Sequence, residues 1–248
     1  MSGYQSFAKV YDTLMSQQVD YNVMADRICS LVQRYGGRRS LMLDLACGGG
    51  ALSLALMQRK SDVIGVDSSA EQLTLARQRL SQAGFYPLLL CQDMTELDLY
   101  GTIESAVCTM DSLNHLKGWE EFCLTLSRVA LFLEPGGLFL FDMNTVYKHS
   151  QVLAEQNFVY DCDSFYCVWQ NEYCQEHHRV DINLDLFFLE KGRYRREHEY
   201  FFETDYSSEQ ILEAVKKAGL SLLAVYDGYE EKMVTDTTQR ILYVAQKK

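Results

Sequence analysis

Short apolar runs alternate with helical patterns over the first part of the chain. Leu41–Leu45 and Val63–Val66 have the length of buried strands, and patterns of helical period follow them. Three later segments, Leu88–Met94, Ser105–Ser112 and Leu133–Asp142, follow in order and are separated by further helical patterns. Strands that alternate with helices are typical of α/β folds with a parallel sheet. We therefore predict an α/β core over residues 38–156, completed by residues 205–248.

From about Asn157 the period changes from helical to two. Val180–Leu186 alternates apolar and polar residues, as a half-buried antiparallel strand does. Phe165–Tyr173 and Tyr194–Thr204 predict two further strands. We predict that residues 157–204 form a small antiparallel β-sheet, inserted after the fifth strand of the core.

Helices are expected on both flanks of the core. Within residues 1–37, Tyr21–Tyr35 places its apolar side chains near one helical face. A second helix is predicted over residues 209–218, because Ser207 or Ser208 provides a favoured N-cap. These elements complete three parts: an N-terminal helical segment, the core and the inserted sheet.

The first strand runs into a glycine-rich turn. Asp44 lies within this strand, and Gly48, Gly49 and Gly50 follow it before a helical pattern begins. Glycines let the backbone approach a ligand too closely for a side chain to intervene. The second strand ends on Asp67, and ligands of open α/β sheets bind at the carboxyl ends of strands, where an acid can bind ribose hydroxyls. We predict a site for a nucleoside-containing cofactor, against the alternatives of a ligand-free turn and of Asp67 as a helix cap.

The turn differs from a dinucleotide-binding turn. That fingerprint is G-x-G-x-x-G, but Ser53 replaces the third glycine here. A carboxylate at Asp44 would repel a pyrophosphate and attract a cationic ligand. S-adenosylmethionine fits this pattern, since it has a sulfonium and an α-amino group but no phosphate.

These segments, in their order and spacing, resemble class I S-adenosylmethionine-dependent methyltransferases. Asp44 with Gly48 and Gly50 is similar to the first motif of that family. Leu88–Met94 and Ser105–Ser112 look like its third and fourth strands, and Leu133–Asp142 is similar to its Pro-Gly-Gly turn and fifth strand. Ala46 stands where the family often has a glycine, and alanine can replace that glycine if the residue keeps a negative φ. The resemblance, to small-molecule members of the amino-sugar and glycine N-methyltransferase kind, implies a Rossmann-like seven-stranded methyltransferase core.

The resemblance also implies where S-adenosylmethionine and its product S-adenosylhomocysteine bind. The methionine part is expected on five residues around the turn: Asp44, Ala46, Cys47, Gly48 and Gly50. Asp67, with Ser68 beside it, is expected to bind the ribose hydroxyls. Asp93 and Met94 are expected at the adenine, although Asp93 could also be an ordinary loop residue. Met110, at the end of the fourth strand, is expected under the methionine part.

Two further residues are candidates near the methyl group. Tyr11 lies in a segment that resembles the N-terminal lid of small-molecule methyltransferases, and an amphipathic helix without ligand contact is the alternative. His115 follows the fourth strand, where it could hold an acceptor or take its proton. The alternative is an exposed loop histidine, and a neutral amine would need no dedicated base.

Composition narrows the class of protein. The net charge of −11 argues against nucleic-acid binding, which depends on clustered Lys and Arg. No apolar run has the length of a membrane span, and no signal peptide is evident.

Five of the eight cysteines lie in segments that read as buried or as the cofactor turn, which is typical of a reducing compartment; we expect a cytoplasmic protein. Those five are Cys29, Cys47, Cys91, Cys108 and Cys123. The cysteines and histidines of the insertion lack the spacing of a zinc site, so we expect no metal.

The sequence therefore predicts transfer of a methyl group to nitrogen or oxygen of a small-molecule acceptor. The alternatives are a non-catalytic S-adenosylmethionine-binding regulatory protein and, with less support, a nicotinamide-dependent oxidoreductase. Aromatic residues are dense in the insertion, where they could form a sheet core, the face of a homodimer or the wall of an acceptor pocket.

Overall fold

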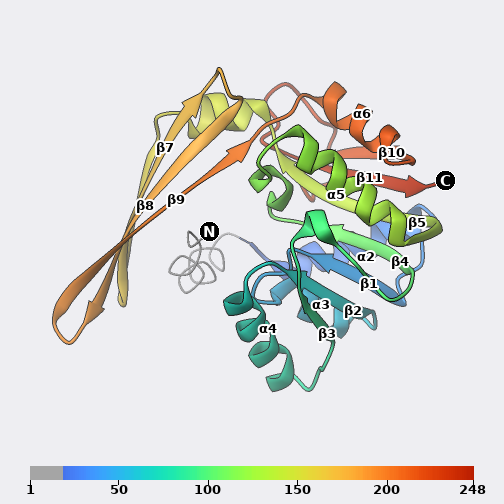
Figure 1. Cartoon of the computed structure of the whole chain (residues 1–248), viewed down its shortest axis with the longest axis horizontal. Coiled ribbons are helices and arrows are strands. Elements are labelled where there is room, and N and C mark those ends of the chain that lie inside the picture. The colour runs from blue at the N-terminus through green and yellow to red at the C-terminus, as the bar shows by residue number, and fades with distance from the viewer. Residues whose placement is uncertain (1–18) are drawn as a thin grey trace.

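Seven strands form one mixed sheet in the computed structural model, which describes residues 19–248 (Figure 1). Its order is β10-β11-β5-β4-β1-β2-β3, and the last five of these strands run parallel to one another. The strands are β1 (Leu41–Leu45), β2 (Asp62–Asp67), β3 (Leu88–Cys91), β4 (Ile103–Cys108), β5 (Leu133–Asn144), β10 (Leu220–Asp227) and β11 (Arg240–Lys247). Because β11 is antiparallel to β5, it begins where the parallel strands end.

Helices cover both faces of this sheet because its strands are apolar on both sides. Leu138 and Leu140 of β5 pack with α2 and α3, whereas Phe139 and Phe141 of the same strand pack with α5 and α6. The helices are α2 (Tyr21–Arg34), α3 (Ala51–Gln58), α4 (Ala70–Gln82), α5 (Trp119–Phe132) and α6 (Ser208–Lys217). Within residues 19–248, no helix is long and apolar enough to cross a membrane.

A separate antiparallel sheet of four strands extends away from the core (Figure 1). Its order is β6-β7-β8-β9, with bounds β6 (Asn157–Cys162), β7 (Phe165–Cys174), β8 (Arg179–Glu190) and β9 (Arg193–Thr204). The predicted alternation on β8 is confirmed, since Val180, Ile182, Leu184 and Leu186 are buried. The sequence analysis missed β6.

Short helices connect the sheets and end several strands. They are η1 (Met94–Glu96), η2 (Ser112–His115) and the π-helix η3 (Lys148–Leu153), which links β5 to the second sheet. Because η1 and η2 follow them, β3 and β4 end earlier than predicted, at Cys91 and Cys108. The predicted Ser207 cap of α6 is confirmed, with a capping box to Gln210.

Gly50 permits close packing between the glycine turn and α4. It has φ +74°, and a Cβ at this position would lie 3.0 Å from the Cβ of Ala76. Gly36, which follows α2, has a similar φ of +72° but nothing within 4 Å of an added Cβ. The two glycines share one backbone requirement and differ in the space around them.

We therefore expect Gly50→Ala to destabilise the protein more than Gly36→Ala. Both substitutions force alanine into the left-handed region, which costs about 1–2 kcal/mol. Gly50→Ala adds overpacking against α4, which costs about 1–3 kcal/mol more. Chemical denaturation of both variants would measure the difference, and equal losses would show that α4 moves freely away from the turn.

Candidate active site

Asp44 is a buried carboxyl group beneath the glycine turn. It is 1% exposed and accepts a hydrogen bond of 2.5 Å from Ser53 Oγ of α3. Burial raises the pKa of Asp44 to about 7, with a smaller contribution from the negative charge of Asp67, and the Ser53 bond opposes both. A cation above the turn would favour ionisation of this group.

The turn contains three left-handed residues. Ala46, Gly48 and Gly50 have φ of 59°, 51° and 74°. The condition of a negative φ at Ala46 is therefore not met, and alanine occupies a conformation in which glycine costs less. Around Gly48 the space is open, since only Gln72 Oε1, at 4.0 Å, comes near an added Cβ.

Asp67 connects the end of β2 to this turn. Its Oδ2 accepts a hydrogen bond from the Gly48 amide at 2.8 Å, and its Oδ1 accepts one from the Ser69 amide at 2.9 Å. Ser69, not Asp67, is the N-cap of α4. The two acids thus lie at the end of neighbouring parallel strands, on either side of an open glycine backbone.

The other predicted cofactor residues lie along the same edge. Cys47 is buried, and its Sγ would be 3.0 Å from a Cβ on Gly65, so its side chain packs beneath the turn. Ser68 is exposed, as is Asp93, whose carboxylate accepts hydrogen bonds from the amide and hydroxyl of Thr95. Met94 is half-buried.

Two predicted residues remain, Tyr11 and Cys91. Tyr11 lies outside the described residues. Cys91 is exposed at the end of β3, so its predicted burial is wrong.

Beyond β4 the chain makes a second left-handed turn. Met110 and Asp111 have φ of 58° and 55°, and neither is glycine. Their amides donate hydrogen bonds of 2.9 and 2.8 Å to the two oxygens of Asp142, a fully buried residue of β5. Arg240 and the hydroxyl of Tyr229 also donate to Asp142, so this carboxylate holds the turn in place.

Arg240 joins two acids at this edge. It contacts Asp142 at 2.5 Å and Asp111 at 3.0 Å. Burial alone would raise the pKa of Asp111, but the charges of Arg240 and Lys148 outweigh it and hold this pKa well below its usual range. Asp111 is therefore ionised at neutral pH.

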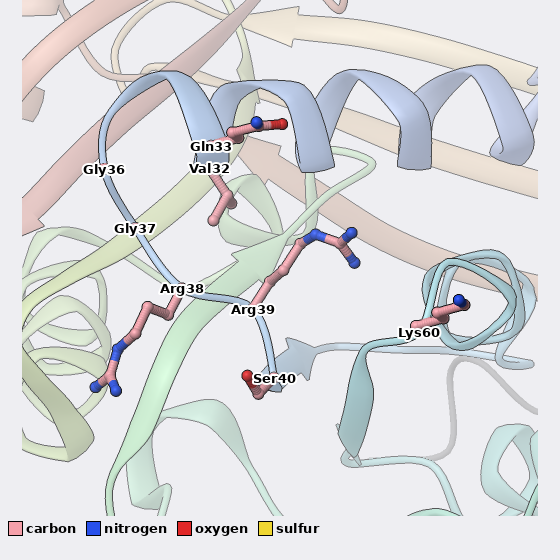
Figure 2. Close-up of a pocket in the computed structure, with 8 residues that line it drawn as sticks. All are labelled: Val32, Gln33, Gly36, Gly37, Arg38, Arg39, Ser40 and Lys60. Atoms are coloured by element: carbon pink, nitrogen blue, oxygen red, sulfur yellow. The ribbon is translucent and has the colours of Figure 1, made fainter.

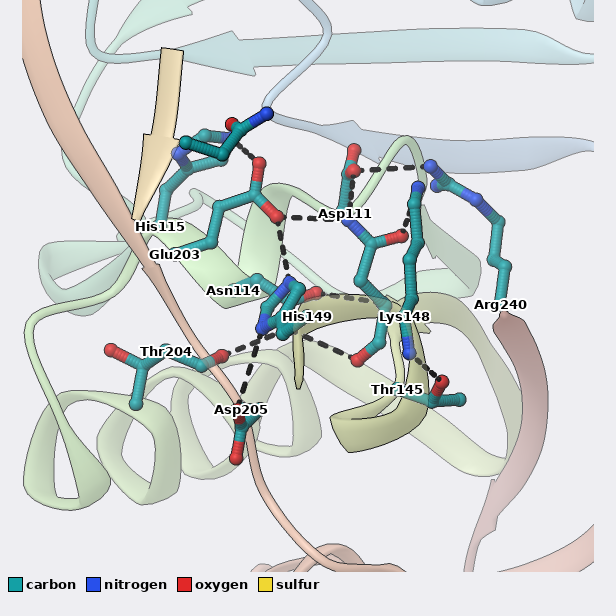
Figure 3. Close-up of polar contacts among 12 residues, drawn as sticks. Asp111, Asn114, His115, Thr145, Lys148, His149, Glu203, Thr204, Asp205 and Arg240 are labelled. Atoms are coloured by element: carbon teal, nitrogen blue, oxygen red, sulfur yellow. Dashed lines mark hydrogen bonds and ion pairs between the residues drawn. The ribbon is translucent and has the colours of Figure 1, made fainter. Parts of the chain in front are cut away.

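Glu203 enters the site from β9 of the second sheet (Figure 3). It is 5% exposed, accepts a hydrogen bond of 2.8 Å from the Asn144 side chain, and lies 4.0 Å from Nε2 of His115. Burial and the charge of Asp111 raise the pKa of Glu203. His149 and His115 lower it by more, so the pKa lies below its usual value. The structure thus brings the predicted His115 together with an ionised carboxylate.

A pair of buried asparagines fixes this arrangement. The side-chain oxygen of Asn114, on η2, accepts a hydrogen bond of 2.9 Å from the backbone amide of Asn144. Its side-chain nitrogen donates one of 2.9 Å to the carbonyl of Thr204. These bonds join η2, β5 and β9 around His115 (Figure 3). The sequence analysis missed Asp111, Asn144, Glu203 and Arg240 as candidate site residues. Their position near the end of a predicted strand, Ser105–Ser112 or Leu133–Asp142, was a usable signal only for Asp111 and Asn144.

The two groups of acids lie beside one another because β1 and β4 are adjacent. The thiol of Cys108, buried at the end of β4, is close enough to both groups to feel their charges. Burial raises its pKa well above the usual value, and the charges of Asp142, Asp44 and Asp67 raise it further. The open turn and these acids fit S-adenosylmethionine, which is cationic and has no phosphate. They do not fit a pyrophosphate.

A surface pocket at the opposite edge of the sheet is distinct from this site. It is lined by Gly36–Ser40 and Lys60, before β1 and β2 begin (Figure 2). Ligands of parallel α/β sheets bind at the carboxyl edge, so this pocket is on the wrong side for the cofactor.

Fold and site together define a class of nucleoside-cofactor enzymes, and comparisons with known proteins agree. Residues 42–137 match the family described as "Methyltransferase domain". The crystal structure of an S-adenosylmethionine-dependent methyltransferase from Clostridium acetobutylicum ATCC 824 is 32% identical, with 98% of each chain covered and a TM-score of 0.89.

Two curated relatives extend this similarity. A Bacillus subtilis (strain 168) protein named as a methyltransferase, YqeM, is 29% identical over 98% of this chain and 97% of its own length. The dTDP-3-amino-3,4,6-trideoxy-alpha-D-glucopyranose N,N-dimethyltransferase of Streptomyces venezuelae is 32% identical over 53% of this chain and 54% of its own. The chain belongs to the S-adenosylmethionine-dependent methyltransferases, and its cofactor is S-adenosylmethionine.

We expect Asp142→Asn to destabilise the protein strongly. An asparagine cannot accept from both backbone amides while it balances Arg240, and breaking a buried ion pair costs about 3–5 kcal/mol. Asp62→Asn, on an exposed acid at the start of β2, is the control and should change stability by less than about 0.5 kcal/mol. Denaturant unfolding of both variants checks this, and similar losses would show that Asp142 is not the residue that holds the turn.

Proposed function

We propose that this protein transfers a methyl group to the nitrogen of a small-molecule amine. The observation that carries the proposal is the pair of ionised carboxylates, Asp111 and Glu203, that lies with His115 at the ends of β4 and β9. Carboxylates attract an ammonium group and give no comparable advantage to a neutral hydroxyl. The dTDP-amino-sugar relative, whose name describes N,N-dimethylation, supports an amine acceptor.

We propose the following arrangement for the cofactor. The methionine part lies on the turn, with its cationic groups toward Asp44 and its backbone contacts at Ala46, Cys47, Gly48 and Gly50. The ribose is held by Asp67 and Ser68, and the adenine by Asp93 and Met94. Met110, which is half-buried after β4, lies between the methionine part and the acceptor.

The bound cofactor supplies a methyl group on a cationic sulfur. An amine that arrives as an ammonium ion must lose a proton before its lone pair can attack this methyl group. In this proposal Glu203 and His115 hold the amine and take that proton. Either group accepts the proton directly, or one group accepts it and passes it to the other. Asp111 orients the remaining N–H bonds, and positioning accounts for the rest of the acceleration.

We expect Asp67→Ala to weaken S-adenosylhomocysteine binding. Loss of hydrogen bonds to a charged carboxylate costs about 1.5–3 kcal/mol, which corresponds to roughly 10- to 150-fold in Kd. Calorimetric titration measures it, with Asp98→Ala, an exposed acid after η1, as the control. Unchanged affinity would remove Asp67 from the cofactor site.

The proposed reaction is tested with a panel of acceptors. The purified protein is incubated with methyl-labelled S-adenosylmethionine and small primary and secondary amines, including dTDP-3-amino sugars, or the matching alcohols. We expect label in an amine product. Label only in alcohols would replace nitrogen with oxygen as the acceptor atom. Cofactor binding without turnover on any acceptor would favour the non-catalytic alternative.

A further inference from the structure

His149 is a buried residue that the proposed reaction does not use. It lies on η3, is 0% exposed, and stands between two acids (Figure 3). Its Nε2 is 3.0 Å from Oε2 of Glu203, a hydrogen bond, and its Nδ1 is 3.6 Å from Oδ2 of Asp205, an ion-pair separation. Glu203 lies near the end of β9 and Asp205 directly follows this strand, where the second sheet returns to the core.

The chemistry of this arrangement requires a charged ring. A neutral imidazole can donate to Glu203 but carries no charge to balance Asp205, whereas an imidazolium donates to Glu203 and forms an ion pair with Asp205. Asp205 is 3% exposed, and no hydrogen bond to its Oδ2 is present in the described part of the chain. With a neutral ring neither carboxylate would gain a balancing charge from His149, and a buried charge without a balancing partner is strongly unfavourable.

We propose that His149 is a positioning residue: a buried imidazolium, held by Asp205, that keeps Glu203 ionised and aimed at the acceptor amine. This inference rests on the proposed function for the role of Glu203. It assigns the contact between η3 and β9, through Glu203 and Asp205, a part in the acceptor site.

The surrounding charges agree with this assignment. Burial favours the neutral ring, but Asp205 and Glu203 outweigh it and raise the pKa of His149 to about 8. Within residues 19–248, the other titratable groups that interact with this pair of acids include Asp111, His115, Lys148, Tyr173, His178 and Tyr206. Burial and Asp205 raise the pKa of Tyr173, which therefore stays neutral.

The sum of charges indicates the kind of acceptor that fits. The cluster contains four carboxylates, and its three cations are Lys148, Arg240 and His149 when His149 is protonated. The four carboxylates are those of Asp111, Asp142, Glu203 and Asp205. One negative charge remains, which a single ammonium group would balance. With a neutral His149, two would remain.

The proposal is tested first without an acceptor. The ¹³C-labelled carboxyl group of Glu203 and the imidazole of His149 are titrated by NMR in the full-length protein. We expect the His149 ring to titrate near pH 8, and the midpoint of Glu203 to rise by at least one pH unit in His149→Gln. The matched control is His178→Gln, since His178 is exposed and lies 3.7 Å from the other oxygen of Asp205; it should leave Glu203 unchanged.

A second variant guards against misfolding of His149→Gln. Asp205→Asn keeps the shape of the side chain and removes its charge, so the midpoint of His149 should fall. A His149 midpoint at or below 6.5 in the unmodified protein would overturn the proposal, as would an unchanged Glu203 midpoint in His149→Gln.

Methyl transfer to a dTDP-3-amino sugar, or to whichever amine the panel shows to be accepted, gives the last readout. We expect kcat to fall at least tenfold in His149→Gln, and the pH profile of kcat to shift in Asp205→Asn. Both kcat and its pH profile should be unchanged in His178→Gln. An unchanged kcat and pH profile would overturn the role in positioning. Because the NMR titrations need no acceptor, failure of the amine assay alone would count against the proposed function and not against the state of His149.

Discussion

The site depends on one buried carboxylate, Asp142. Its two oxygens accept the amides of Met110 and Asp111, which both adopt a left-handed backbone that non-glycine residues rarely occupy. Arg240, from the first residue of β11, then balances both Asp142 and Asp111. The direction of the chain after β4, and with it the position of His115, follows from this single group. Strain of this kind persists only where the surroundings over-determine it.

Negative charge is the property that the two halves of the site share. On the cofactor half, burial raises the pKa of Asp44, so its ionisation is costly until a cation binds. On the acceptor half, Arg240 and Lys148 have already offset that cost for Asp111. In the proposed arrangement, a cationic methyl donor gains most from Asp44, whereas an amine meets carboxylates that are ionised before it arrives.

Local pattern was enough to predict which residues gather at the glycine turn, but not which residues surround His115. Asp44, Gly48, Gly50 and Asp67 lie in short segments whose strand-turn-helix order is visible in the sequence, and the structure places them on one edge. The φ of Ala46 could not be read in this way, because the residue type itself gives no sign of a left-handed conformation. Glu203 could not be predicted as a site residue, because its position depends on how a whole inserted sheet returns to the core.

That return makes the inserted sheet part of the site. Asn114 of η2 donates to the carbonyl of Thr204, so the end of β9 is fastened to the segment that carries His115. His149 fastens it again, from the helix that leaves β5 toward the same sheet. A sheet attached at both its entrance and its exit cannot tilt without moving Glu203. The position of Glu203 is therefore coupled to the orientation of the insertion, and insertions that differ only in their outer strands would leave the proposed chemistry of the carboxylates unchanged.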